Sequence, residues 1–128
     1  VAKAIDGAKN SLAEAAFGFT QQGKADPEYP MLHATSFLKM FGLVESARLL
    51  LEQATIARTK LRVIWEDKGI DAGDADARRA LAEQQDDVRF YEGKIKNASF
   101  FAHQLLPEVR ALLKSIQSSD RSALDMVF

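Results

Sequence analysis

Apolar residues recur three or four positions apart along most of the chain, whereas strict alternation of apolar and polar residues is almost absent. The first spacing is typical of amphipathic helices and the second of half-buried strands, so the pattern predicts an all-α protein. The first stretch has this helical spacing at Ile5, Ala8, Leu12, Ala15 and Phe19. It ends at Gly23, which we expect to adopt the left-handed conformation that closes many helices.

A second, longer stretch follows Pro27 and Pro30, with Asp26 as the expected N-cap. Its apolar seam consists of Phe37, Met40, Val44, Ala47, Leu51, Ala54, Arg58, Leu61 and Trp65, thickened by Phe41, Leu50 and Ile64. Arg58 is the one charged residue of this seam, and we expect its aliphatic stem to lie along the groove. Gly42 and Ala47 are expected to let a neighbouring backbone come close, so Gly42→Leu would overpack the seam and cost about 1–3 kcal/mol.

Residues 66–76 hold two glycines and five carboxylates against one lysine, which predicts a solvated connection. Asp71, Asp74 and Asp76 suggest calcium, but a calcium-binding loop needs acidic residues at alternate positions, a central glycine and a terminal glutamate. That register is absent here. We therefore expect Asp74 or Asp76 to cap the following helix.

The third stretch predicts a helix of roughly thirty residues or more, with a kink at Pro107. Its seam is Leu81, Val88, Tyr91, Ile95, Ala98, Ala102, Leu105, Val109, Leu112 and Ile116, thickened by Phe90, Phe101 and Leu113. Pro107 has no N–H to donate, and its ring displaces the carbonyl of His103. The cluster Ser118, Ser119 and Asp120 predicts the start of a short final helix that runs through Val127.

These elements predict three long helices plus a short C-terminal helix, packed as an up-and-down antiparallel bundle in one domain over residues 1–128. The chain begins without Met and already in helical phase, so we expect it to be excised from a longer chain. No apolar run is long enough to span a membrane, and the first residues lack the basic and apolar pattern of a signal peptide, so we expect neither a membrane span nor a signal peptide.

The composition excludes several classes of site. Seventeen basic residues balance eighteen acidic ones for a net charge of -1, which argues against a nucleic-acid-binding protein. The chain has no cysteine, so it can form no disulfide, thiolate zinc site or iron–sulfur cluster. The hydrophobic content of 47% is enough for a folded domain and excludes intrinsic disorder.

The two histidines argue against the chemistry that helical bundles often carry. A di-iron centre needs Glu-x-x-His pairs, but Pro30 precedes His33 by three residues and Phe100 precedes His103. A phosphotransfer histidine needs a lysine a few residues later, and Lys39 is nearly two turns beyond His33. We therefore expect both histidines to be partly exposed, at a helix end or at the kink.

The charged and aromatic residues predict surfaces instead of a catalytic site. Glu83, Asp86, Asp87 and Glu92 have the placement of a solvated helix face, and the basic cluster Arg58, Lys60 and Arg62 is expected to form surface ion pairs with Glu66 and Asp67. Phe90 with Tyr91, and Phe100 with Phe101, form two adjacent aromatic pairs. Because neighbouring residues diverge by about 100° on a helix, one member of each pair is expected to fill the core and the other to face a partner.

Two windows carry a family resemblance. Residues 37–42, Phe-Leu-Lys-Met-Phe-Gly, and above all residues 90–108, with Phe90, Tyr91, Lys94, Phe101 and Pro107, resemble the extra C-terminal helical domain of one branch of the bacterial acyl-CoA dehydrogenases, the branch that includes 3-methylmercaptopropionyl-CoA dehydrogenase. The resemblance covers roughly residues 30–117. The chain departs from that family at Ser99, where members tend to have arginine, and at His103, where they tend to have an acidic residue, so no salt bridge is carried over at these positions.

The resemblance implies a parent flavoprotein oxidoreductase of the cytoplasm that oxidises an acyl-CoA to an enoyl-CoA and binds FAD. In such enzymes a glutamate takes the α-proton, FAD accepts a hydride, and an electron-transferring flavoprotein receives the electrons. No residue here matches those motifs, so we assign this segment no catalytic, cofactor-binding or metal-binding residue. It implies instead a structural role, with packing on the rest of the parent chain and on a second subunit. The alternatives are a stand-alone interaction or small-ligand module and a histidine phosphotransfer bundle.

Overall fold

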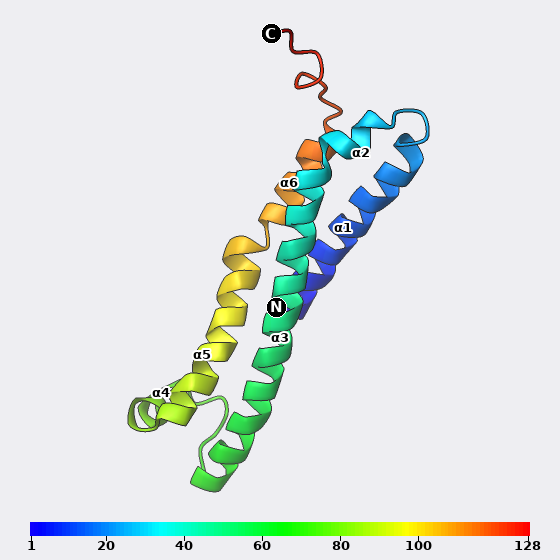
Figure 1. Cartoon of the computed structure of the whole chain (residues 1–128). Coiled ribbons are helices and arrows are strands. Elements are labelled where there is room, and N and C mark those ends of the chain that lie inside the picture. The colour runs from blue at the N-terminus through cyan, green and yellow to red at the C-terminus, as the bar shows by residue number, and fades with distance from the viewer.

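The computed structural model describes residues 1–128, and all of its regular secondary structure is helical. Helix α1 spans Ala2–Gln22 and runs antiparallel to the first half of α3, which spans Ala34–Lys68 and extends along the whole molecule (Figure 1). The short α2, Glu28–Leu32, joins them. The predicted all-α class and up-and-down arrangement are therefore confirmed.

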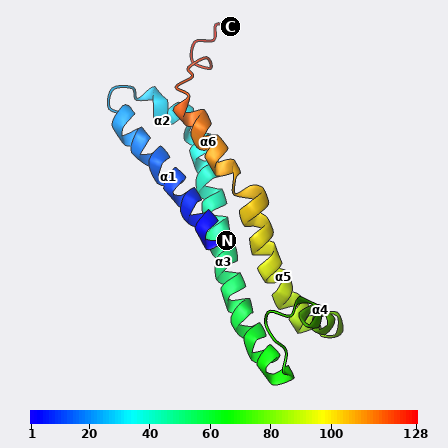
Figure 2. The same cartoon turned by 180° about the vertical axis from the view of Figure 1, so that it is seen from behind.

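The rest of the chain returns along α3 in several pieces instead of one helix. Helix α4, Ala75–Gln84, is followed by α5, Asp86–Phe100, then by the π-helical turn η1, Phe101–Leu105, and by α6, Glu108–Gln117. Seen from behind, α5 and α6 form one bent rod with α4 folded against its lower end (Figure 2). No helix combines the length and the apolar character that a membrane crossing requires.

The core consists of two separate clusters. The large cluster lies where α1, α2, α6 and the first half of α3 meet, and its buried members are Ile5, Ala8, Ala15, Tyr29, Met40, Val44, Ala47, Leu106, Val109, Leu113 and Ile116. The small cluster lies where α4, α5 and the second half of α3 meet, and its members are Leu61, Trp65, Leu81 and Val88. Between them, α3 and α5 contact each other through buried alanines, among them Ala54, Ala57 and Ala98.

The prediction for Gly23 was wrong about its conformation. Its φ of -63° is right-handed, so the residue is not needed for a left-handed cap. A Cβ atom at this position would lie 2.5 Å from the carbonyl oxygen of Phe19 and 3.0 Å from Cγ of Pro30. Glycine therefore allows the turn between α1 and α2 to close tightly. Asp26 does not cap α2 with its side chain, which instead forms an ion pair with Arg121.

The predicted seam of α3 is confirmed at its buried positions on both sides of Arg58, including Ala54, Leu61 and Trp65, and is wrong at Arg58. Ala57 is buried in its place, whereas Arg58 is exposed. The reason is a change of partner, because α1 reaches only to the middle of α3 and α5 takes over beyond it (Figure 1). Gly42 is exposed with open space around it, which also overturns the expectation that Gly42→Leu would overpack the core.

The predicted third helix is interrupted twice. At Gln85 the backbone is extended, with φ -128° and ψ 119°, and Arg89 donates to the carbonyls of Ala82 and Glu83 that α4 leaves free at its end. At the expected kink, the N–H of Leu106 donates to the carbonyl of Phe101 over 2.9 Å, an i to i+5 bond. This wider turn accommodates Pro107, and it turns Leu106 into the core instead of the predicted Leu105.

The predicted short C-terminal helix is absent. Ser119 has a positive φ of 58°, and residues 118–128 form only isolated turns. Arg121 holds the segment through ion pairs with Asp26 and Glu28, while Leu124, Met126, Val127 and Phe128 are exposed. With no apolar face buried, so short a segment has no packing to stabilise a helix.

Candidate functional site

Two aromatic side chains stand out from α5. Phe90 is 60% exposed and Phe100 is 59% exposed, whereas their neighbours Tyr91 and Phe101 are half-buried against the two core clusters. The prediction that one member of each aromatic pair faces outward is confirmed. Phe90, Phe100 and Leu105 of η1 are the large apolar side chains exposed along the α5–η1 segment, and we call these three residues the α5 face.

A shallow groove of about 300 Å³ runs between α3 and α5 beside Phe90. Its apolar lining comes from Ile56, Ala57, Phe90 and Tyr91, and its polar edge comes from Gln53 and Lys94. Nζ of Lys94 donates to Oε1 of Gln53 over 3.0 Å and lies 5.1 Å from the centre of the Phe90 ring. The lysine thus bridges the two helices above an apolar floor.

The exposed side of α3 carries a second apolar pattern, which lies outside both core clusters and includes Gln53 and Ile56 of the groove. Leu49, Ile56 and Val63 are 44%, 56% and 64% exposed and lie seven residues apart. Gln53 and Lys60 lie between them, so the five residues follow one line along the helix at alternating four- and three-residue spacing. We call these five residues the outer row. They form a continuous exposed strip because the buried residues of this stretch, such as Ala54 and Leu61, lie on the other side of α3.

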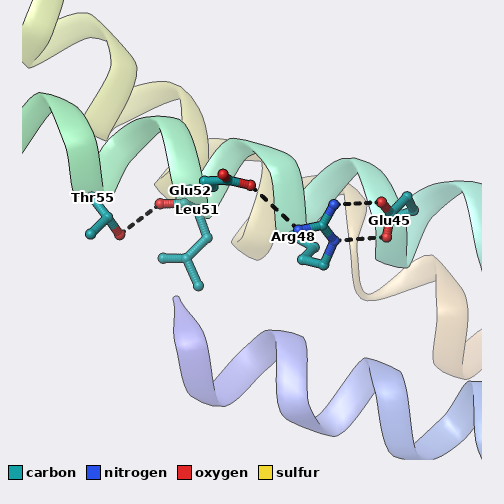
Figure 3. Close-up of polar contacts among 5 residues, drawn as sticks. All are labelled: Glu45, Arg48, Leu51, Glu52 and Thr55. Carbon is teal, nitrogen blue, oxygen red and sulfur yellow. Dashed lines mark hydrogen bonds and ion pairs between the residues drawn. The ribbon is translucent and has the colours of Figure 1, made fainter.

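An ion-pair ladder lies along α3 around Arg48 (Figure 3). Arg48 donates to both carboxylate oxygens of Glu45, over 2.9 and 2.7 Å, and more weakly to Glu52 over 3.4 Å. The hydrogen bonds from Arg48 lower the pKa of Glu45, and those to Glu45 raise the pKa of Arg48. Farther along α3, Thr55 donates to the carbonyl of Leu51 over 2.8 Å.

The basic cluster on α3 does not form the expected pairs. No carboxylate lies within ion-pair distance of Arg58, Lys60 or Arg62, and Glu66 and Asp67 are likewise without a basic partner. These three cations therefore remain available on the surface.

One ion pair is largely buried, at the small cluster. Nε and Nη2 of Arg78 donate to the two carboxylate oxygens of Glu92 over 2.9 and 2.8 Å, and the guanidinium lies 4.4 Å from the centre of the Trp65 ring. Nη1 of Arg78 also reaches the carbonyl of Ala72 over 3.2 Å. The prediction that Glu92 lies on a solvated face is wrong, since it is buried and fastens α5 to α4.

Several predictions for single polar residues are confirmed. His33 lies at the junction of α2 and α3 and packs edge-on against Tyr29, and His103 lies in η1, where its Nδ1 is 2.7 Å from the carbonyl oxygen of Ser99. Asp74 caps α4 by accepting from the N–H of Ala77 over 3.0 Å. No group of three or more histidine or carboxylate side chains is placed to hold a metal ion.

The surroundings of His33 do not favour phosphoryl transfer. Lys114 and Ser118 share a surface hollow with it, but Nε2 of His33 is buried without a hydrogen-bond partner, out of reach of a phosphoryl donor. Burial raises the pKa of Tyr29, whose hydroxyl donates to the carbonyl of Ile116 over 3.3 Å. Hydrogen bonds from Ser122 lower the pKa of Asp120.

Comparison with known proteins decides the family. The profile of the family described as "Acetyl-CoA dehydrogenase C-terminal like" matches residues 1–127. The chain belongs to this family. It is also 30% identical over 102 residues to a butyryl-CoA dehydrogenase of Syntrophomonas wolfei subsp. wolfei. That match covers 80% of this chain but only 14% of the relative, and no solved structure matches the chain significantly.

In this acetyl-CoA dehydrogenase C-terminal-like chain, the sequence predicted the outward Phe90 and Phe100 of the α5 face but placed Leu105 in the core, and two further features were missed. The buried Glu92 could have been found from its position four residues after Val88 and three before Ile95, which places it on the inward side of α5. The outer row could have been found from the seven-residue spacing of Leu49, Ile56 and Val63.

Proposed function

We propose that this chain is the C-terminal domain of an FAD-dependent acyl-CoA dehydrogenase and that its role there is structural. Family membership over residues 1–127 is the observation that carries the proposal. The match to a small fraction of a butyryl-CoA dehydrogenase is consistent with a domain of a larger enzyme. The parent would oxidise an acyl-CoA to an enoyl-CoA in the cytoplasm and pass electrons to an electron-transferring flavoprotein.

The α3–α5 groove does not have the features of an FAD site. Cofactor pockets enclose most of the ligand and add a few convergent polar groups, whereas the α3–α5 groove is shallow and its polar side chains, Gln53 and Lys94, bond to each other. The two unpartnered buried nitrogens, on His33 and Trp65, do not line this groove. We therefore assign no step of the flavin chemistry to this segment.

The α5 face is the surface that we assign to contact with the body of the enzyme. Phe90 and Phe100 are large aromatic side chains whose exposure is unfavourable in water, and burying them against another protein would stabilise the assembly. Packing at the α5 face would hold in place the parts of the parent enzyme that form the walls of its substrate cavity, without contacting the substrate. A second subunit is the other partner that we propose for the domain.

Complementation in trans tests this role. The parent enzyme without this domain is mixed with the 128-residue chain, and binding and acyl-CoA oxidation are measured. We expect the chain to bind and to raise activity, and Phe90→Glu with Phe100→Glu to abolish both effects. Phe17→Glu, at an exposed phenylalanine of α1, is the matched control and should behave as wild type.

Two results would contradict the proposal. One is a gene in which no dehydrogenase sequence is joined to this segment, which would favour a stand-alone interaction or small-ligand module. The other is wild-type complementation by the double glutamate variant, which would remove the α5 face from the contact.

A further inference from the structure

A pocket of about 250 Å³ lies between α1 and the η1–α6 segment, where these elements run side by side (Figure 2). None of its lining residues belongs to the α5 face or to the α3–α5 groove. The lining residues are Lys3, Ala4, Gly7, Ala8, Ser11, Ala102, Leu106, Pro107, Val109 and Arg110.

The inner part of this pocket is apolar. Ala8, Leu106 and Val109 are buried members of the large cluster. A Cβ atom at Gly7 would meet nothing within 4 Å, so the pocket is open at this residue. The hydroxyl of Ser11 donates to the carbonyl of Gly7 over 3.2 Å and is therefore already satisfied within α1. A dry cavity of about 150 Å³ can hold benzene, so this pocket has room for the apolar part of a small molecule.

The two charged residues that line the pocket are both basic. Lys3 and Arg110 are exposed, and neither has a carboxylate within ion-pair distance. The nearest acidic residues along the two helices, Asp6 and Glu108, form ion pairs with other lysines. Two free cations at the edge of an apolar hollow favour a ligand that has one negative end and one apolar end.

We propose that this pocket binds a small organic carboxylate. The apolar part of the ligand lies against Leu106 and Val109, and its carboxylate lies at the exposed edge, where Lys3 and Arg110 donate to it. A guanidinium can donate to both oxygens of a carboxylate, and the ammonium group adds a second positive charge. A neutral or cationic molecule of the same shape leaves both cations unpaired, so the pocket selects its ligand by charge.

This site goes beyond the structural role proposed above. It shares no residue with the α5 face, so a failure of complementation in trans would leave it intact. An empty pocket would likewise leave the complementation result intact. The two proposals are therefore tested separately.

Titration of the 128-residue chain with benzoate, followed by two-dimensional amide NMR, tests the site. We expect saturable shifts at the amides of Gly7, Ala8 and Ala102, with a Kd on the order of 1 mM for a ligand of so few atoms. Benzyl alcohol has the same ring without the charge, and benzylamine has the opposite charge, so both should bind at least about tenfold more weakly. Added salt should weaken the binding of benzoate, because exposed cations are screened.

Charge substitutions test the edge of the pocket. Lys3→Gln and Arg110→Gln should each weaken the binding of benzoate by about three- to tenfold, because each removes one of the two cations. Lys9→Gln is the matched control, at an exposed lysine of α1 outside the pocket, and should bind as wild type does.

A size substitution tests the inner part. Gly7→Leu places a side chain in the open space of the pocket and should abolish binding. Gly93→Leu is the matched control, at a glycine of α5 that also has open space around it, and circular dichroism should show both variants to be helical.

Two results would overturn the proposal. One is the absence of saturable shifts at the pocket amides up to about 20 mM benzoate, well above the expected Kd. The other is equal binding of benzoate and benzyl alcohol, which would show that Lys3 and Arg110 do not recognise the carboxylate.

Discussion

The two core clusters of this molecule are stabilised in different ways. The large cluster, around α1, α6 and the first half of α3, contains eleven buried residues, ten of them from four helices and Leu106 from the link between the π turn and α6, and almost all of them are aliphatic. The small cluster contains only Leu61, Trp65, Leu81 and Val88 as buried members. The ion pair of Arg78 and Glu92 lies beside it, with the guanidinium over the Trp65 ring. One end is held by apolar packing on several sides, and the other by one aromatic side chain and one buried ion pair.

This difference follows from how many helices surround α3 at each end. Near its start, α3 is flanked by α1 and α6, so a wide stripe of side chains is removed from water. Near its end, α5 and the short α4 are the only neighbours, and a large indole is needed to fill the space between them. Each residue of the small cluster should therefore contribute more to its own end of the molecule than a typical residue of the large cluster does.

The largest effect is expected from Trp65→Ala. Removing a fully buried aromatic side chain leaves a cavity and should lower the free energy of unfolding by about 3–5 kcal/mol. Trp65→Phe is the matched control, and it should cost clearly less, because the indole N–H has no hydrogen-bond partner to lose. Urea denaturation measures both, and equal losses for the two variants would show that the indole N–H matters after all.

The next effect concerns the ion pair. Glu92→Ala leaves Arg78, whose side chain is 25% exposed, without its carboxylate, and should cost about 2–3 kcal/mol. Arg78→Met combined with Glu92→Leu removes both charges and should recover much of that loss. If Glu92→Ala proved neutral in thermal denaturation, the pair would be a surface contact only. The exposed pair of Arg79 and Glu83 supplies the comparison, because Glu83→Ala should change stability by less than about 0.5 kcal/mol.

Alanine substitutions at two glycines are expected to change the free energy of unfolding in opposite directions. Gly23→Ala should destabilise the α1–α2 turn by about 1–3 kcal/mol, because its Cβ would lie 2.5 Å from the carbonyl oxygen of Phe19. Gly93→Ala should stabilise the protein by about 0.5–1 kcal/mol, because Gly93 is an exposed residue of α5 with open space around it. A stabilising Gly23→Ala in the same urea measurement would contradict the close approach.

The smallest effect is a pH dependence at the large cluster. Burial raises the pKa of Tyr29 above its ordinary value of 10.0, so the unfolded chain loses this proton at a lower pH than the folded chain. Its contribution to stability is fully present below pH 10.0 and decreases as the pH rises through the folded-state pKa. In a Tyr91→Phe background, tyrosinate absorbance should titrate later in the folded protein than in urea. Coincident titration curves would show that the Tyr29 hydroxyl is accessible to water.

The parts of this fold that the sequence predicts are those where one helix keeps one partner. The seam of α1 is correct because it faces α3 and α6 throughout, and the outward turn of Phe90 and Phe100 follows from the angle between adjacent helical residues. The α3 seam fails at Arg58 because the neighbour changes from α1 to α5 there. A spacing pattern along one helix contains no information about where its neighbours end.

The remaining differences have equally local causes. The final helix fails because helical spacing at Ala123, Leu124 and Val127 stabilises nothing without a surface to cover. The pairing of Arg78 with Glu92 spans fourteen residues and the break at Gln85, and only the folded backbone defines where that break lies. The outward position of Phe90 and Phe100 could thus be predicted from the sequence, whereas the exposure of Leu105 and the pairing of Glu92 with Arg78 depend on the folded backbone.

The π turn at Phe101–Leu105 has a mechanical consequence. One additional residue in a turn changes the rotation of everything that follows by about 100°. The π turn therefore sets the rotation of α6 about its axis independently of that of α5. As a result Val88 of α5 faces the small cluster, while Leu113 of α6 faces the large cluster. If one residue were deleted from this turn, α6 would be rotated relative to α5, and the apolar sides of the two helices could no longer both face their clusters.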